Sequence, residues 1–277
     1  MTVDVGRALS ETVQEMATRR GLALVGGFVL VSALSLTLSW ALAIALAESF
    51  LSALLGVGQE AGPALSGAER EMLAQQVGAV QEAAPIALDL PAGVALAALL
   101  AVALGAEAIT LLAIRVFGEY ETEEGEPLYA GLGLATLNGF LGGIVLFTLV
   151  SIGLVLLVIP GVFLYVVFLF YQQEIALQDR NFIEALAQSW RVTAGIRLRV
   201  FGLAILVVLV SLVGGVPSAI ASATQIQSIE VASAVLVGPV VTVFTAGLIT
   251  RAYVGVDETA ETEEPSGALR PEDIPEP

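Results

Sequence analysis

The sequence predicts an all-α fold: a polytopic membrane bundle of about six transmembrane helices, with amphipathic helices at the membrane interface. Of the 277 residues, 57% are hydrophobic and 14% are charged, whereas soluble domains have about 45–50% and about 25%. Long uncharged stretches exceed the roughly 20 residues that a helix needs to cross a bilayer. Their hydrophobicity is continuous rather than alternating, which argues against a transmembrane β-barrel.

The uncharged stretches define the spans. Gly21–Ala47 has 27 residues without a charge, and Leu128–Gln173 has 46, which suits two crossings rather than one. Proline disfavours helix in the residue before it, so we expect the turn between these two crossings at Pro160-Gly161. A turn at Ser151–Gly153 is the alternative that balances the two lengths better. The expected spans are residues 21–47, 91–114, 129–158, 160–177, 200–217 and 231–252, in a membrane domain of residues 21–254.

The arginines predict the orientation. All 11 basic residues are arginine, and with the N-terminus in the cytoplasm only Arg70 falls in an outer segment. This distribution predicts a plasma-membrane protein with both termini in the cytoplasm. A cleavable signal peptide beginning at Arg19-Arg20 is the competing interpretation, but 27 uncharged residues exceed the usual apolar region of about 7–15.

Three segments are expected outside the membrane. Residues 1–20 have the periodicity of a cytoplasmic amphipathic helix, and the outer loop 48–90 contains a helix that starts with a capping box of Ser66 and Glu69. The acidic, proline-rich tail 255–277 is expected to be disordered and cytoplasmic.

Composition excludes several classes of function. The chain has no cysteine, histidine or lysine, which removes thiolate metal sites, histidine bases, cysteine nucleophiles and Schiff-base chemistry. A net charge of −16 argues against nucleic-acid partners. We therefore expect no enzyme, no catalytic residues, no cofactor and no metal. The acidity and the exclusive use of arginine are typical of a halophilic archaeon.

One acid, Glu107, lies inside an expected span, about 12 Å deeper along the helix than Arg115. Ionisable residues at such depth usually face a cavity or a partner. Glu107 is a candidate proton- or cation-responsive group, with Asn138 and Gln173 or Glu174 as its partners. The alternative is a neutral carboxyl that makes one interhelical hydrogen bond, worth about 0.6 kcal/mol.

The polar segment between the fourth and fifth spans predicts an interfacial helix. Asn181 and Glu184 form a helix start, and Gly195 supplies the stop. A tryptophan at headgroup level fits such a helix. The structural residues expected in it are Glu184, Ser189, Trp190, Arg191 and Gly195.

Part of the chain resembles known membrane proteins. The resemblance is based on the residues Ile159-Pro160-Gly161, Glu174 and Glu184-Ala185-Leu186-x-x-Ser189-Trp190-Arg191-x-Thr193-x-Gly195. They are similar to a loosely related bacterial and archaeal set that includes haloarchaeal proteins and the membrane domain attached to glycerophosphoryl diester phosphodiesterases. The resemblance covers about residues 128–254 and implies a helical membrane module. Because no catalytic domain follows the spans here, it implies architecture rather than activity.

These observations favour a non-catalytic membrane module that organises membrane lipids or a protein partner. A small transporter or channel that uses the Glu107 carboxyl is the alternative.

Overall fold

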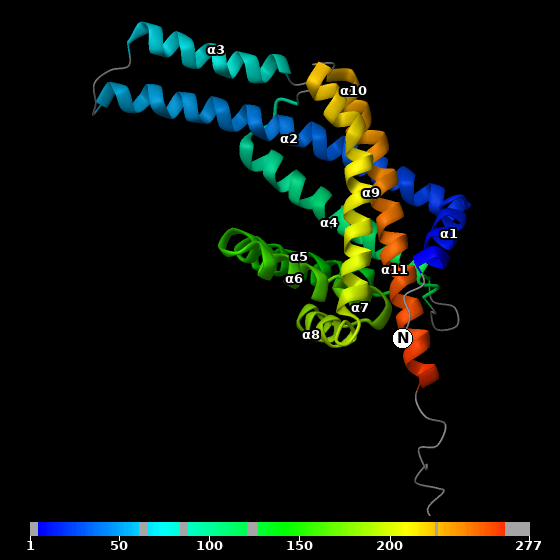
Figure 1. Ribbon diagram of the computed structural model, residues 1–277. Coiled ribbons are helices and arrows are strands. Elements are labelled where there is room, and N and C mark those ends of the chain that lie inside the picture. The colour runs from blue at the N-terminus through cyan, green and yellow to red at the C-terminus, as the bar shows by residue number, and fades with distance from the viewer. Residues whose placement is uncertain (1–4, 61–65, 84–87, 121–126, 225–226, 264–277) are drawn as a thin grey trace, which may run out of the picture. The chain divides into compact units, whose positions relative to one another are not determined.

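The computed structural model describes residues 5–60, 66–83, 88–120, 127–224 and 227–263, and every regular element in these residues is a helix (Figure 1). The predicted all-α class is confirmed. Six helical segments are long and apolar enough to cross a membrane. They are Arg19–Ala53, Ala92–Phe117, Leu132–Leu156, Val158–Gln178, Arg197–Thr224 and Ser228–Val256.

The chain forms two compact units. The first unit contains residues 1–24, 110–213 and 241–277, and the second contains residues 25–109 and 214–240. The boundaries between the two units fall inside long helices, so one helix can contain residues of both units.

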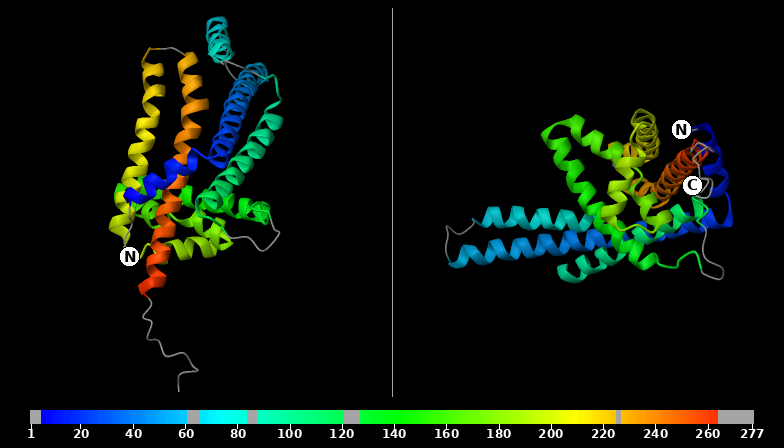
Figure 2. Two further views of the ribbon diagram at one scale, coloured as in Figure 1. Left: turned by 90° about the vertical axis from the view of Figure 1, so that its right-hand side faces the viewer. Right: turned by 90° about the horizontal axis from the view of Figure 1, so that it is seen from below.

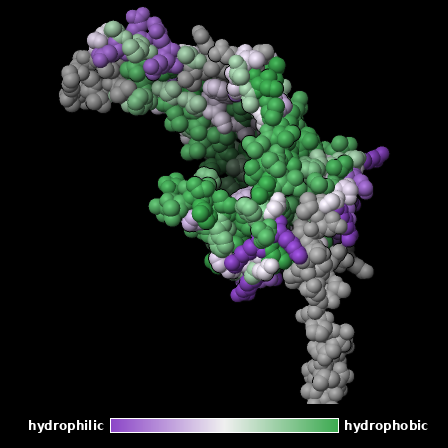
Figure 3. All heavy atoms as spheres, in the orientation of Figure 1, coloured by the Kyte–Doolittle hydropathy of each residue, from purple (hydrophilic) through white to green (hydrophobic). Residues whose placement is uncertain are grey.

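In the first unit, α5 (Leu132–Leu156) and α6 (Val158–Val167) lie side by side as a hairpin (Figures 1 and 2). The turn is the single extended residue Leu157, which falls between the two expected turns at Ser151–Gly153 and Pro160-Gly161. Pro160 instead occupies the first turn of α6, where its missing N–H breaks no intrahelical bond. Hydrophobic side chains cover the visible face of this hairpin (Figure 3).

The fourth candidate span is broken. Helix α6 ends at Val167, and α7 (Tyr171–Gln178) begins after three residues outside regular helix. Around this break lies the main core of the first unit, which also includes α9 (Arg197–Thr224) and α11 (Gly238–Glu263). The Phe170 ring meets the Tyr253 ring edge-on, with centroids 5.5 Å apart. Buried core residues include Val166, Phe170, Val200, Leu203, Leu248 and Ala252.

Helix α1 (Val5–Met16) packs on the first unit through small residues. Ala8 and Thr12 are buried on its inner face. A Cβ atom at Gly247 would lie 2.8 Å from both Thr12 Cγ2 and Phe117 Cε1, so this glycine allows α1 and the end of α4 (Ala92–Phe117) to approach α11.

The second unit departs from the expected boundaries. Helix α2 (Arg19–Glu60) continues beyond residue 47, because the segment that follows contains no proline, and its glycines Gly56 and Gly58 do not end the helix. Helix α9 likewise runs through Pro217 to Thr224. After α10 (Gln227–Ala232), a π-helical turn, η1 (Ser233–Val237), precedes Gly238-Pro239.

The capping box of α3 (Gly67–Ala83) is confirmed. The backbone N–H and the hydroxyl of Ser66 donate to Glu69 Oε2 at 2.7 and 2.8 Å, and the Glu69 N–H donates to Ser66 Oγ at 3.3 Å. The Ser66 side-chain bond and then its backbone bond lower the pKa of Glu69. The cap therefore stabilises the helix above the ordinary pKa of Glu69 and is lost as pH falls through the lowered value.

At the other end of the chain, α11 extends to Glu263, beyond the expected start of the tail at residue 255. Residues 264–277, on which the rest of that expectation falls, lie outside the described part.

Glycine packing in the α5–α6 hairpin yields a stability prediction. A Cβ at Gly153 would lie 2.8 Å from Gly161 Cα, and backbone cannot yield as a flexible side chain can. We expect Gly153→Ala to lower the free energy of unfolding in detergent by about 1–3 kcal/mol. Gly133→Ala, in the same helix with nothing within 4 Å of the added Cβ, is the matched control and should be neutral or stabilising. Equal stabilities of the two variants would contradict the close approach.

Candidate functional site

The most connected buried polar side chain is Arg115, in the last turn of α4, which is 0% exposed. Its Nε donates to the Ala176 carbonyl at 3.0 Å, and its Nη1 donates to the carbonyls of Leu128 (3.0 Å) and Ala130 (2.6 Å). Its Nη2 donates to Asp179 Oδ1 at 3.0 Å. One guanidinium group thus joins α4 to the segment before α5 and to the end of α7.

Asp179 holds this arginine from the surface side. It ends α7 in the left-handed conformation, with φ of 49°, which aspartate tolerates better than most residues. Its side chain is 57% exposed, whereas that of Arg115 is fully buried. The Tyr120 hydroxyl donates to Asp179 Oδ2, and the Tyr120 ring lies 4.5 Å from the guanidinium carbon of Arg115. The ion pair therefore connects the interior to the surface.

Glu174 is a buried carboxylate one turn earlier in α7, 1% exposed. The Tyr253 hydroxyl of α11 donates to its Oε1 at 3.1 Å, and Arg180 Nε lies 3.3 Å from its Oε2. A buried charge is tolerated when it is paired and hydrogen-bonded, and both conditions hold here. The carboxylate thus joins α7 to α11.

Gln173, the neighbour of Glu174, is 2% exposed. Its Nε2 lies 3.4 Å from Thr250 Oγ1 of α11, a long hydrogen bond. Its Oε1 is buried and has no hydrogen-bond partner among the described residues. Gln173 and Glu174 therefore both face α11, as close neighbours in one helix.

Asn138 of α5 takes part in a different contact. Its Oδ1 accepts from the backbone N–H of Phe182 at 3.1 Å, and its Nδ2 donates to the Leu134 carbonyl at 3.0 Å. The side chain of Asn181 caps the next two N–H groups of α8 (Phe182–Val192) at 3.1 and 3.0 Å. Together the two asparagines satisfy the first three donors of this helix, which confirms the predicted helix start.

Ser189 of α8 and Thr193, the residue that follows α8, bind a backbone carbonyl at the break in the fourth span. Ser189 Oγ and Thr193 Oγ1 donate to the Val167 carbonyl at 2.9 and 3.3 Å. That carbonyl belongs to the last residue of α6, where the helical hydrogen bonds stop.

The outer face of α8 carries the aromatic residue. The buried face carries Ala185 and Ser189, whereas Ile183 and Trp190 are exposed. Gly195, the predicted stop, follows the helix with φ of 88°. Glu184 and Arg191 are also exposed, on the same helix.

Glu107 belongs to the second unit, where it is half-buried in α4. Its expected partners Asn138, Gln173 and Glu174 all belong to the first unit. Among the contacts given above, Asn138 binds the start of α8, and Gln173 and Glu174 bind side chains of α11.

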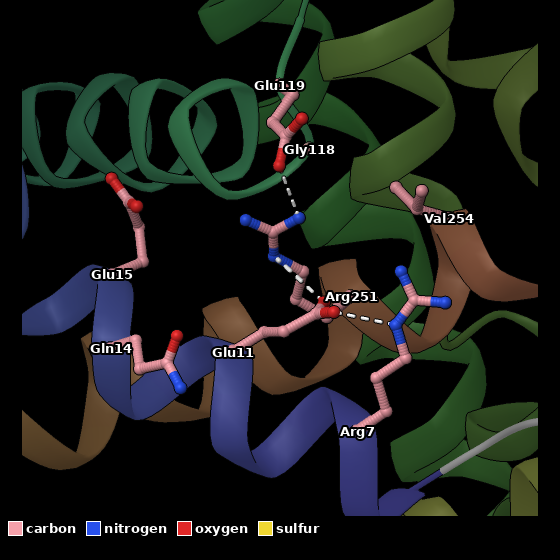
Figure 4. A pocket seen from close by; sticks show the side chains of 8 residues that line it. All are labelled: Arg7, Glu11, Gln14, Glu15, Gly118, Glu119, Arg251 and Val254. Atoms are coloured by element: carbon pink, nitrogen blue, oxygen red, sulfur yellow. Dashed lines mark hydrogen bonds and ion pairs between the residues drawn. The ribbon is translucent and has the colours of Figure 1, made fainter.

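A polar cavity of about 330 Å³ lies where α1 meets α11 (Figure 4). Glu11 lies between two arginines, with Arg7 Nε at 2.7 Å and Arg251 Nε at 3.8 Å. Arg251 Nη1 also donates to Glu119 Oε1 at 2.7 Å. The cavity is lined by opposite charges that already pair with one another, which attaches α1 to the bundle.

The described residues contain no group of three or more acidic side chains placed to hold a metal ion. Among the buried polar atoms described above, Gln173 Oε1, Glu174 Oε2 and Arg251 Nε have no hydrogen-bond partner in this part of the chain, although the last two lie within ion-pair distance of Arg180 and Glu11. The other contacts join helices to one another or to the segments between them.

Comparison with known protein families identifies the family of the chain. A family described as a domain of unknown function, DUF7847, matches residues 3–256. The chain belongs to this family. The match covers all six candidate spans, and it includes Arg115 and its hydrogen-bond partners. The domain that defines this family is therefore a multi-pass membrane protein fold. Comparison with curated proteins found no match, and comparison with solved structures found none.

Sequence reasoning missed Arg115, Asp179 and Tyr253. The sequence places Arg115 at the end of its span, where it counts toward the predicted orientation and lies along the helix from Glu107. The pattern carries no signal for its carbonyl partners, because any residue supplies a carbonyl.

Replacing Arg115 tests its structural role. Arg115→Gln removes a buried charge and leaves acceptors unsatisfied, so we expect a loss of about 3–5 kcal/mol in the free energy of unfolding in detergent. Arg115→Lys should also destabilise, since three ammonium donors cannot reproduce the planar fork. The matched control is Arg20→Gln, at an exposed arginine. If Arg115→Gln and Arg20→Gln had the same free energy of unfolding, the contacts of Arg115 would not hold the first unit together.

Proposed function

We propose that the chain is a non-catalytic membrane module that organises lipids or a protein partner in the plasma membrane. The observation that carries this proposal is the use of the buried polar groups of the first unit. The buried Arg115, Glu174 and Ser189 and the half-buried Asn138 each contact another helix or the segment leading to one. A transport or catalytic site needs such groups turned toward a ligand instead.

The composition supports the same proposal. Without histidine, cysteine or lysine, mechanisms that need a histidine base, a cysteine nucleophile or a lysine Schiff base are not open to this chain. The strongly acidic composition favours membrane lipids or a protein over nucleic acid, and it supports a halophilic archaeal source. The resemblance of residues 128–254 to the membrane domain attached to glycerophosphoryl diester phosphodiesterases supports a module role.

We further propose that both termini face the cytoplasm. The two units divide the arginines sharply: ten of the 11 lie in the first unit, and Arg70 alone lies in the second. Positively charged residues accumulate on the cytoplasmic side of membrane proteins. This division supports a cytoplasmic position for the arginine-containing segments of the first unit, which include the N-terminal helix α1.

A small transporter or channel is the second candidate. The second unit contains the half-buried Glu107, Pro217 inside α9 and the π-helical turn η1. Interrupted helices and π-bulges occur at binding sites in membrane proteins. This candidate predicts flux that depends on the Glu107 carboxyl.

Ion flux in proteoliposomes separates the two candidates. With a pH gradient and a fluorescent pH probe inside, the module function predicts a proton leak equal to that of empty vesicles. Glu107→Gln should leave it unchanged, as should Glu71→Gln at an exposed position of α3. A proton flux above that of empty vesicles would establish transport and refute the module function if Glu107→Gln abolished it and Glu71→Gln preserved it.

The absence of cysteine makes the orientation directly measurable. Gln14→Cys in α1 and Gln76→Cys in α3 each place one thiol at an exposed glutamine of a helix outside the candidate spans. In intact cells, a membrane-impermeant maleimide should label Gln76→Cys and should label Gln14→Cys only after lysis. Labelling of Gln14→Cys in intact cells would contradict the proposed orientation.

A further inference from the structure

The junction of α8 and α9 is rich in positive charge. Residues 180–199 contain four arginines and a single acid, Glu184, in a chain where acids outnumber arginines 27 to 11. Three of the four, Arg191, Arg197 and Arg199, lie in the last turn of α8 and the first turn of α9. We call these three residues the arginine cluster.

The arginine cluster lacks carboxylate partners. Elsewhere in the first unit, Arg7, Arg115, Arg180 and Arg251 each form an ion pair with a glutamate or an aspartate, whereas Arg19 and Arg20, like the cluster, form none among the described residues. The three residues of the cluster form no ion pair with any residue in the described part of the chain. In so acidic a protein, cations left without internal counter-charges point to an anion that comes from outside.

Arg197 is held in a fixed orientation. Its guanidinium carbon lies 5.0 Å from the ring centroid of Trp190 and 5.2 Å from that of Phe163. Phe163 and Trp190 themselves meet edge-on at 5.6 Å. Stacking on aromatic rings fixes the plane of the guanidinium and leaves its N–H edges available. Its Nε is buried and has no hydrogen-bond partner among the described residues.

The backbone favours an anion at the same place. Helix α9 is 28 residues long and has no acidic residue in its first turn. The positive end of the helix dipole there favours anions, and it is an unfavourable place for two arginines unless an anion is bound.

The neighbouring surface is apolar. Leu198, between two arginines of the cluster, is 83% exposed, and Trp190 is 40% exposed. Exposed aromatic and aliphatic groups beside arginines are typical of the boundary between headgroups and acyl chains. A soluble anion would not need this apolar surface, whereas a lipid would cover it with its acyl chains.

We propose that the arginine cluster binds the phosphate of an anionic lipid headgroup, with Arg197 as the principal contact and with Arg191 and Arg199 as further positive charges at the same helix junction. Guanidinium groups bind phosphate oxygens in bidentate geometry, and basic surfaces on the cytoplasmic side of membrane proteins bind anionic headgroups. This proposal deepens the lipid-organising function proposed above, because it names the lipid class and the residues that contact it.

Quenching of Trp190 fluorescence tests the proposal. The chain has two tryptophans, so Trp40→Phe leaves Trp190 as the only one. In bilayers, brominated phosphatidylglycerol should quench Trp190 at several-fold lower mole fraction than brominated phosphatidylcholine. Arg197→Gln should reduce that preference about fivefold, the effect of about one basic residue near an anionic surface. Arg20→Gln removes the same charge from an exposed site outside the cluster and should leave the preference unchanged.

A second variant keeps the test valid if Arg197→Gln fails to fold. Arg191→Gln combined with Arg199→Gln changes two exposed side chains that make no described contact, and it should also reduce the preference while the helical circular dichroism is kept. Equal quenching by the two lipids in the parent chain, or a preference that all these variants retain, would overturn the proposal.

Inorganic phosphate separates the two sources of the anion. In phosphatidylcholine bilayers at constant ionic strength, inorganic phosphate should leave Trp190 fluorescence unchanged. A change that Arg197→Gln abolishes would instead establish a site for soluble phosphate and overturn the lipid assignment. Proton flux is a separate readout: Glu107-dependent flux would refute the module function without altering the lipid preference.

Discussion

A fully buried guanidinium group is the constraint on which the first unit depends. Burying a charge in a membrane protein is costly, and the cost is offset only when donors and acceptors match. Arg115 meets this condition with three backbone carbonyls and one carboxylate. The Ala176 carbonyl lies in the last turn of α7, and those of Leu128 and Ala130 lie in the segment before α5, so the same contacts stabilise the side chain and satisfy carbonyls that lipid could not.

The properties that sequence predicts well here are local. An uncharged stretch long enough to cross the bilayer is visible in the residues themselves, because lipid forces a helix to satisfy its own backbone. The caps of α3 and α8 were equally accessible, since Ser66 with Glu69 and Asn181 with Glu184 lie within one turn of each other. The helix class, the candidate spans and two helix starts therefore follow from short-range patterns.

The candidate site depends on contacts that are distant in sequence. Glu174 meets Tyr253 79 residues away, and Arg115 meets Asp179 64 residues away. Asn138 accepts a hydrogen bond from the backbone N–H of Phe182 at the start of α8, 44 residues later, and its sequence position carries no signal for this contact, because an amide is suited to many partners. Turn positions are similarly underdetermined: in a continuous apolar run, Leu157 differs from its neighbours in no property that pattern analysis uses.

Arg115 stabilises the first unit mainly through backbone carbonyls rather than through its ion pair. A double-mutant cycle of Arg115→Met and Asp179→Asn, measured by unfolding in detergent, separates the two contributions. Because the Asp179 side chain is 57% exposed, Asp179→Asn should cost about 1 kcal/mol or less, and Arg115→Met should cost several times more. Equal costs for the two single variants, with a coupling energy as large as either, would show that the ion pair alone is responsible and would contradict the account.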